Sequence, residues 1–232
     1  MLLKSLNLPK ECVYKQFIPK KQFYTHGNLK PTEKNIFTQG IERMTLYAQL
    51  TRQNTNIPTY KDETRTYEEI SIFLVELREL QEMEKIATLI MEAIPYPIIL
   101  IGKFDDQYNF FGAHQRDNLV DEQKIILEKV YQTGFLYSNS IFIEQINYKD
   151  LRKNDFFTFY NDYVQAIIEF NLASRNIKQT ENKEATLQKI ERLEAEITML
   201  KGKLKRENHF NKKMELNMKI KRLEKELKQM EG

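Results

Sequence analysis

The sequence has few of the residues that would place it in a specialised class of proteins. Among 232 residues there is one cysteine, Cys12, and there is no tryptophan. A single thiol can form neither an internal disulfide nor a structural zinc site, which favours a reducing compartment. Seven glycines and six prolines exclude a collagen-like or linker-rich chain.

Long apolar segments are also missing. The longest strongly apolar run, Pro97 to Gly102, is far shorter than the roughly 20 residues that a membrane-spanning helix needs. The stretch from Met1 to Leu6 contains no apolar region of signal-peptide length. We therefore expect a soluble, cytoplasmic protein that has no membrane segment.

Charge, in contrast, is abundant. Charged residues make up 30% of the chain, and hydrophobic residues still make up 41%, enough for a core. The charged fraction exceeds the usual value of about 25%, which often indicates exposed helices. The net charge is only +3, well below that of a dedicated nucleic-acid-binding domain.

The first three quarters of the chain alternate between helical and strand patterns. Residues 1–31 are interrupted by prolines and predict an irregular segment that wraps around the domain formed by residues 32–174. Helical spacing predicts helices over residues 32–51, 80–94, 117–130 and 155–168. Apolar runs predict strands over 70–77, 98–104, 108–114 and within 135–146. The order predicts an α/β (α+β) domain with a small, mixed four-stranded sheet and flanking helices.

Two of these helices depend on particular residues. In the first, Thr32 is a candidate N-cap, and apolar residues follow at spacings of 4, 3 and 4, namely Phe37, Ile41, Met44 and Ala48. In the third, Asp117 or Asp121 is a candidate cap, and Gly134 lies just beyond the end. Each of these two helices is predicted from its local sequence pattern alone. The pattern does not show which elements pack against the helix.

The C-terminal arm, residues 182–232, differs in composition, because Glu and Lys dominate and Phe210 is the only aromatic residue. Two apolar seams have heptad spacing: Ile190, Leu193, Ile197, Leu200 and Leu204, followed by Leu216, Ile220, Leu223, Leu227 and Met230. The seams do not share a register. We therefore predict an antiparallel coiled-coil helical hairpin with its tip near residues 206–211. The alternative is one long helix that dimerises.

The predicted tip is basic. Between residues 201 and 213 six cations stand against Glu207, a net charge of +5. These candidate nucleic-acid-binding residues are Lys201, Lys203, Lys205, Arg206, Lys212 and Lys213. They could contact phosphates, or they could simply form a solvated face.

Catalytic and metal-binding patterns are nearly absent from the sequence. His26, His114 and His209 lie far apart, and His114 with Asp117 forms a close histidine–carboxylate pair. No third metal ligand accompanies that pair. The sequence has no phosphate-binding glycine loop and none of the common hydrolase motifs. We expect no metal site, no catalytic residues and no cofactor.

A metal-dependent nuclease, or another enzyme that processes nucleic acid, is the alternative function. Such a site needs acidic residues on neighbouring strands together with a lysine. Asp62 and Glu76 are the nearest approach, but Arg78 stands where a titratable lysine is needed. The nucleophile candidate Cys12 has no base nearby in the sequence. The aromatic residues of 104–111 and 156–163 could stack on bases, although core packing also explains them.

Several stretches together resemble the bacterial family called domain of unknown function 4391. They are Leu8-Pro9-Lys10, Ile18-Pro19-Lys20-Lys21-Gln22-Phe23-Tyr24, Ile41-Glu42-Arg43, Tyr67-Glu68-Glu69-Ile70, Phe73-Leu74-Val75-Glu76-Leu77, Ala93-Ile94-Pro95-Tyr96-Pro97-Ile98-Ile99 and Glu207-Asn208-His209-Phe210-Asn211-Lys212-Lys213-Met214-Glu215-Leu216-Asn217. The resemblance covers nearly the whole chain. It departs at Tyr47-Ala48-Gln49-Leu50, where the family pattern has a tryptophan and a lysine.

The resemblance implies an accessory subunit of a bacterial anti-phage or restriction-modification-type system. Members of the family are encoded beside helicases and DNA methyltransferases, so a protein of that kind is the expected partner. The resemblance supplies no catalytic residues. Three functions therefore stay open: a non-catalytic interaction subunit, a small nucleic-acid enzyme, and a structural self-association module. The protein is expected to be a monomer or a homodimer.

Overall fold

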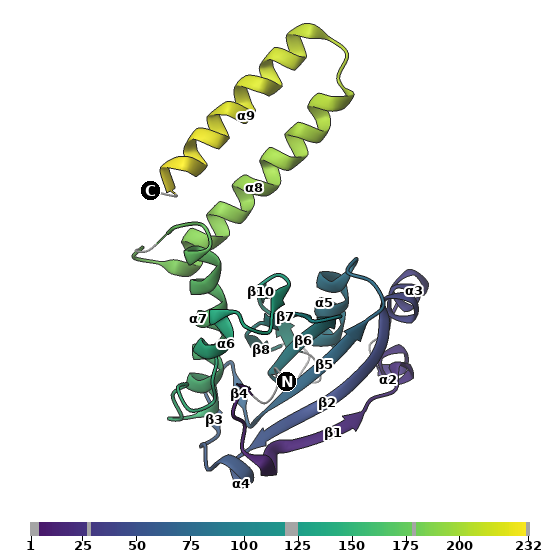
Figure 1. Ribbon diagram of the computed structural model, residues 1–232, viewed down its shortest axis with the longest axis vertical. Helices are drawn as coiled ribbons and strands as arrows, with labels where there is room; N and C mark the ends of the chain where they lie inside the picture. The colour runs from purple at the N-terminus through teal and green to yellow at the C-terminus, as the bar shows by residue number, and fades with distance from the viewer. Residues whose placement is uncertain (1–4, 27–28, 119–124, 178–179, 231–232) are drawn as a thin grey trace. The chain divides into compact units, whose positions relative to one another are not determined.

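The computed structural model describes residues 5–26, 29–118, 125–177 and 180–230 (Figure 1). Its contacts divide the chain into two compact units, Met1–Ile167 and Ile168–Gly232, which we call the sheet unit and the helical unit. In the described part of the chain, no helix is both long enough and apolar enough to cross a bilayer.

A mixed sheet forms the centre of the sheet unit, which confirms the predicted mixed α/β architecture. Over the described residues it has seven strands in the order β1-β2-β5-β6-β7-β10, and β11 also pairs with β7. The strands are β1 (Val13–Phe17), β2 (Ile41–Thr51), β5 (Glu69–Leu77), β6 (Ile98–Phe104), β7 (Gln107–Gly112), β10 (Tyr131–Gln132) and β11 (Leu136–Tyr137). The predicted four-stranded sheet was too small, because β1, β2 and the short β10 were not recognised as strands.

The apolar run of β5 forms the middle of this sheet. β5 pairs in parallel with β6, while β6 and β7 form an antiparallel hairpin. The crossover helix α5 (Met83–Ala93) joins β5 to β6 and covers one face of the sheet. Helix α5 begins directly after its N-cap residue Glu82, whose backbone is left-handed with a φ of 61°. The predicted strands 70–77 and 98–104 and the helix between them are confirmed.

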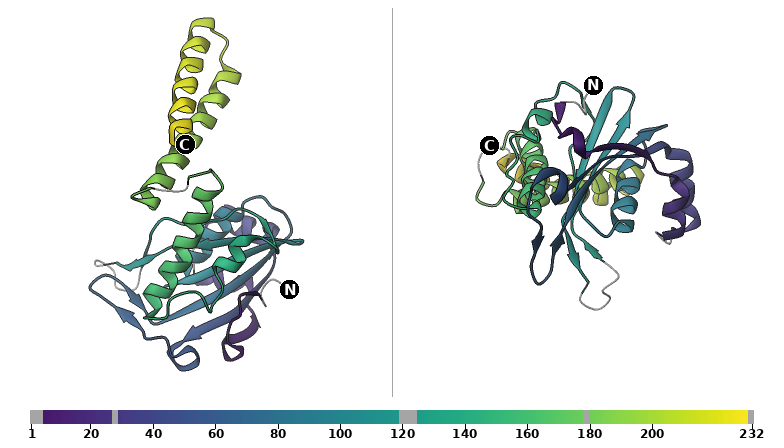
Figure 2. Two further views of the ribbon diagram at one scale, coloured as in Figure 1. Left: turned by 60° about the vertical axis from the view of Figure 1, so that its left-hand side comes forward. Right: turned by 90° about the horizontal axis from the view of Figure 1, so that it is seen from below.

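Helices also cover the second face of the sheet (Figure 2, right). They are α6 (Ile141–Gln145) and the first part of α7 (Phe156–Ala173). The Tyr160 hydroxyl donates to the Ile98 carbonyl at 2.7 Å, and the Phe110 and Phe142 rings lie 5.1 Å apart. The Asp155 carboxylate accepts from the Thr158 amide at 2.6 Å, as expected for the start of the predicted helix.

The predicted helix over residues 32–51 is wrong in its second half. Helix α3 (Pro31–Gly40) begins one residue before the predicted cap Thr32 and ends at Gly40, where β2 begins. The register of β2 against β5 shifts between Ile41 and Arg43, as in a β-bulge. A bulge adds one residue to a strand, so Ile41 and Met44 reach the same core at a spacing of three. The bulge therefore imitates helical periodicity.

Two further predictions are corrected. The segment predicted as a helix over 117–130 instead forms the hairpin β8 (Gln115–Asp117) and β9 (Ile125–Leu127), so Asp117 is no helix cap. The other candidate cap, Asp121, lies outside the described residues. The strand predicted within 135–146 is limited to the two residues of β11, because Ser140 caps α6 by accepting from the Phe142 amide at 3.4 Å.

Segments predicted to be irregular contain short regular elements. Before α3, the chain forms the 3-10 helix η1 (Lys10–Cys12), β1 and α2 (Lys20–His26). The register of β1 against β2 is broken between Val13 and Gln16, and Lys15 there has a φ of 55°. The predicted loop over 52–66 contains the elements α4 (Arg52–Thr55), β3 (Tyr60–Lys61) and β4 (Thr66–Tyr67).

The helical unit contains two long helices, α8 (Lys183–Arg206) and α9 (Phe210–Met230). The side chain of Asn182 caps α8 by accepting from the Ala185 amide at 2.9 Å. A link of three residues, 207–209, joins the helices, so they run in opposite directions (Figure 1).

Candidate nucleic-acid interface

Apolar residues hold α8 and α9 together. Ile197, Leu200 and Ile220 form a buried cluster, and four half-buried residues pack against it, namely Leu204, Leu216, Leu223 and Leu227. Ile190 and Leu193 are buried as well, and Met230 is half-buried. Most of the predicted seam residues therefore meet in one cluster.

Three ion pairs bridge the two helices on either side of this cluster. Lys189 lies 2.8 Å from Glu226, Lys201 lies 2.7 Å from Glu224, and Lys219 lies 2.7 Å from Glu196. Each pair joins an α8 residue to an α9 residue, as expected for antiparallel neighbours. Lys201, one of the six predicted nucleic-acid-binding residues, therefore has an ion-pair partner within the unit.

The link between the helices is arranged around Glu207. Its carboxylate accepts hydrogen bonds from the amides of Asn208 and His209, both at 2.9 Å. The His209 amide, the Asn208 amide and the nearby charge of Lys212 lower the pKa of this carboxyl group below its usual value. Glu207 thus stays charged: its Oε1 accepts from two amides of the link, and Lys212 adds a nearby positive charge.

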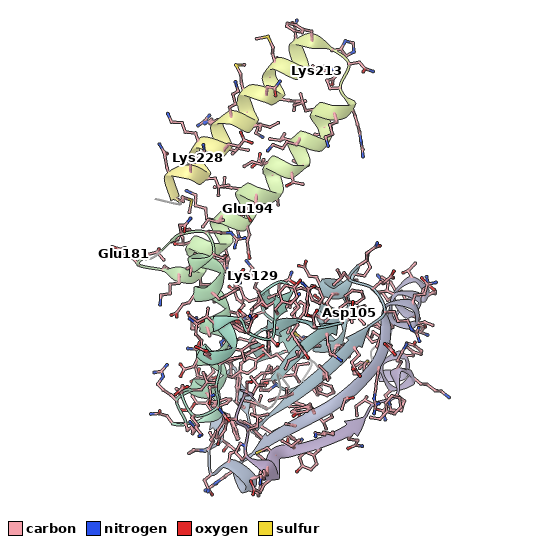
Figure 3. All side chains as sticks on the ribbon, in the orientation of Figure 1. Asp105, Lys129, Glu181, Glu194, Lys213 and Lys228 are labelled. Atoms are coloured by element: carbon pink, nitrogen blue, oxygen red, sulfur yellow. The ribbon has the colours of Figure 1, made fainter. Side chains whose placement is uncertain are left out.

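The other five predicted cations lie within four residues of this link in the sequence, and Figure 3 labels one of them, Lys213. All are exposed: Lys203, Lys205, Arg206, Lys212 and Lys213. Over the part of the chain that the structure describes, none of the five belongs to an ion pair. The tip of the helical unit therefore presents positive charge that is not held in ion pairs among the described residues.

An open groove of about 560 Å³ lies at the same end of the helices. It is lined by Lys203, Arg206, Glu207, Lys212, Glu215, Leu216 and Lys219. Three of the predicted cations share this groove, whereas Lys205 and Lys213 lie outside its lining. The groove shows that cations from both helices converge, although they are separated in sequence.

Four further cations on α9 were missed by the sequence analysis. Lys221, Arg222, Lys225 and Lys228 are exposed, and no ion pair involves them among the described residues. The spacing of Lys221, Lys225 and Lys228 is 4 and 3, so they share the helix face that lies away from Ile220 and Leu227. The regular spacing of these lysines is visible in the sequence, but they lie outside residues 201–213, where the tip was predicted.

The candidate nuclease residues do not come together. Asp62 lies in the turn between β3 and β4, where the amides of Thr64 and Arg65 donate to its carboxylate at 2.7 and 2.8 Å. Those bonds and the Tyr60 hydroxyl keep the Asp62 pKa at about 2. Glu76 lies near the carboxyl end of β5, where it pairs with Lys103 at 3.0 Å. No cluster of three potential metal ligands occurs among the described residues.

The remaining reactive candidates are structural groups. The His114 ring nitrogens lie 2.7 Å from the Tyr67 hydroxyl and 3.3 Å from the Asn161 side-chain oxygen, so the ring is held within the fold. The Cys12 thiol is buried, and burial, followed by the charge of Glu11, raises its pKa to about 11. The His26 side chain lies outside the described residues.

The aromatic residues of the sheet unit pack in its interior instead of forming a base-stacking platform. Six of the nine aromatic residues in question are fully or almost fully buried: Phe110, Phe111, Phe156, Phe159, Tyr160 and Tyr163. Phe104, Tyr108 and Phe157 are half-buried. None of these aromatic residues is therefore exposed for stacking on bases.

Comparison with known families connects the whole chain to one of them. Residues 6–227 match the model of the family described as a domain of unknown function, DUF4391. Neither the curated proteins nor the solved structures contain a match to this chain. Because the matched residues extend through the sheet unit and both long helices, the resemblance seen in the sequence is confirmed. The chain is a member of the DUF4391 family.

Proposed function

We propose that this chain is a non-catalytic accessory subunit that contacts nucleic acid through the tip of its arm. In this proposal α8 and α9 form a closed antiparallel coiled coil, which leaves their outer surfaces free. The observation that carries the proposal is the set of five exposed, unpaired cations around the link: Lys203, Lys205, Arg206, Lys212 and Lys213.

Unpaired cations suit phosphate binding for a physical reason. A lysine that lacks an internal carboxylate partner loses no ion pair when it meets a phosphate, and the nucleic acid releases condensed counterions in exchange. Lys201 and Lys219 would first have to leave Glu224 and Glu196. The five tip cations can therefore meet phosphates without first giving up an ion pair among the described residues.

The length of α8 adds reach. Its 24 residues place Arg206 about 35 Å along the helix axis from Lys183. A two-helix hairpin of that length can present its link to a groove or a strand that a compact domain does not reach.

The wider role of the protein follows from the family resemblance. We propose that it acts in the bacterial cytoplasm with a helicase or DNA methyltransferase of an anti-phage or restriction-modification-type system. The sheet unit is then the part that binds the protein partner. The self-association alternative is less well supported, because α8 and α9 already bury their apolar residues against each other.

Charge reversal tests the nucleic-acid contact. We expect the combined change Lys203→Glu, Lys205→Glu, Lys212→Glu and Lys213→Glu to weaken binding of labelled DNA by roughly tenfold or more. If all four lysines contact phosphates, the slope of log affinity against log salt should fall by about 3. Fluorescence anisotropy over a salt series measures both quantities.

A matched control carries the same four reversals on exposed lysines of the sheet unit, namely Lys10, Lys34, Lys61 and Lys149. Its net charge equals that of the tip variant, so a nonspecific effect of charge would weaken both proteins equally. Equal weakening, or no effect of the tip changes, contradicts the proposal.

Two further measurements test the accessory role. We expect the tagged protein to co-purify from its host with a helicase or methyltransferase, also after nuclease treatment. We expect the pure protein to leave DNA intact in the presence of Mg²⁺. Degradation that needs a metal ion and disappears in Glu76→Ala would replace the accessory function with the nuclease alternative.

A further inference from the structure

Phe210 is placed unusually for an aromatic residue. It is the only aromatic residue of the arm, it opens α9, and it is 73% exposed. Over the described residues, no other large apolar side chain is as exposed. Fourteen phenylalanines occur in the chain; in the sheet unit Phe110, Phe111, Phe156 and Phe159 are buried, whereas Phe17 is 53% exposed. The exposed ring of Phe210 is therefore available to a ligand.

The neighbours of Phe210 are polar and basic. Asn208, His209 and Asn211 are exposed, and Lys212 and Lys213 follow directly. The link has one carboxylate, Glu207, and it accepts from its own backbone. An exposed ring is thus surrounded by hydrogen-bonding side chains and by cations that have no ion-pair partner.

Met214 and Met218 continue the apolar surface from Phe210 at successive spacings of four residues. They are 49% and 61% exposed. Residues four apart on a helix lie on the same side, so the three side chains form a short stripe. Cations flank this stripe, because Lys213 precedes Met214 and Lys221 follows Met218.

This combination distinguishes between classes of ligand. The core of a protein–protein interface is depleted of lysine, whereas here Lys212 and Lys213 lie two and three residues from the exposed ring. In a nucleic-acid duplex the faces of the bases are stacked on one another and hidden from an aromatic side chain. In an unpaired strand the faces are open, and proteins bind such strands with aromatic rings beside cations.

We infer that the tip binds an unpaired stretch of nucleic acid and discriminates against a duplex. Phe210 stacks on one base, and Met214 extends the apolar contact. Lys212, Lys213 and Arg206 contact the flanking phosphates. Asn208 and Asn211 are placed to hydrogen-bond base edges. This inference rests on the proposed nucleic-acid contact and specifies the kind of strand that the tip binds.

Paired binding measurements test the inference. Wild-type protein, Phe210→Ala and Met199→Ala are titrated into a labelled single-stranded oligonucleotide and into its duplex. For Phe210→Ala we expect single-strand affinity to fall about 5- to 150-fold, the range of losses seen when a stacking ring is removed. Duplex affinity should change by less than about twofold, because the ring does not stack on paired bases.

Met199→Ala is the matched control. Met199 is 49% exposed and lies on α8, so the change removes apolar surface of the helical unit away from the tip. We expect it to leave both affinities unchanged. Neither substituted residue is buried, since Phe210 is 73% and Met199 49% exposed. Circular dichroism checks that both variants remain folded.

A spectroscopic test needs one substitution. The chain contains no tryptophan, so Phe210→Trp introduces a single fluorescent indole at the tip. Stacking on a base quenches indole emission. We expect quenching with the single strand and little change with the duplex at equal saturation.

The outcomes separate the two proposals. If tip charge reversal abolishes binding while Phe210→Ala leaves single-strand affinity intact, the stacking inference is wrong and the phosphate contact stands. Equal losses for both kinds of DNA, or a wild-type preference for duplex, also overturn the inference. If wild-type protein binds neither kind of DNA, both proposals fail.

Discussion

The sheet unit and the helical unit use their residues in opposite ways. Helix α5 buries six of its eleven residues against the sheet, whereas in the 21 residues of α9 Ile220 alone is buried. A crossover helix on a sheet loses much of its surface to the core, while each of two paired helices keeps most of its circumference in water. The difference teaches that a helix packed on a sheet is held by many buried side chains, whereas α9 is held by few.

Deletion of a buried side chain should produce the largest contrast between the units. Phe111 is fully buried in the core between the sheet and α5, so Phe111→Ala should cost about 3–5 kcal/mol. Ile220→Ala should cost about 2 kcal/mol, the low end for such a change, since the half-buried leucines around it can close the cavity. Denaturant unfolding measures the first loss, and hydrogen exchange in residues 183–230 measures the second. A larger cost for Ile220→Ala would break the comparison.

Glycine-to-alanine changes should have opposite signs in the two units. At Gly112 in β7, an added Cβ would lie 2.9 Å from a Tyr163 ring carbon and 3.2 Å from a Val164 methyl. Because this ring is buried, we expect Gly112→Ala to destabilise by about 1–3 kcal/mol. At Gly202 in α8, no described atom lies within 4 Å of the added carbon.

Gly202→Ala should therefore stabilise α8 by about 1 kcal/mol, the difference in helix propensity. Thermal melts of the two variants, followed by circular dichroism, compare the effects directly. Destabilisation by Gly202→Ala would indicate that a close contact at this glycine matters more than helix propensity.

The smallest effects should come from the ion pairs that bridge α8 and α9. Lys201 and Glu224 are 53% and 41% exposed, and such pairs contribute about 0.2–1 kcal/mol. A double-mutant cycle with Lys201→Gln and Glu224→Gln measures the coupling. We expect it to vanish in about 1 M salt, where the Debye length is about 3 Å. A coupling that persists there would point to a more buried pair.

The sequence predicted those elements whose signal is local and regular. The continuous apolar run of β5, the spacing along α5 and the hairpin of β6 and β7 are all visible without knowledge of their neighbours. β2 was missed because two register shifts against β5 disturb its alternation. These shifts depend on a partner strand that cannot be identified from a local pattern.

The candidate site was predictable only where its residues are close in the sequence. The cations around the link are close in sequence, so their clustering was evident. The pairing of Lys201 was not, because its partner Glu224 becomes a neighbour only when the chain reverses. The exposure of Phe210 could not be predicted either. An aromatic residue between two apolar seams could equally have packed against the seam residues at the end of the two helices.

The interruption of β1 has a consequence for the protein in concentrated solution. β1 ends the strand order, so among the described residues its outer backbone groups have no second strand to bind. A regular strand at this edge could pair with a strand of another molecule and so start aggregation. Lys15, with its φ of 55° at the break in register, puts a kink and a positive charge at that edge. Such features discourage runaway strand addition, so a five-residue strand with two exposed aromatic rings, Tyr14 and Phe17, is protected from seeding aggregates.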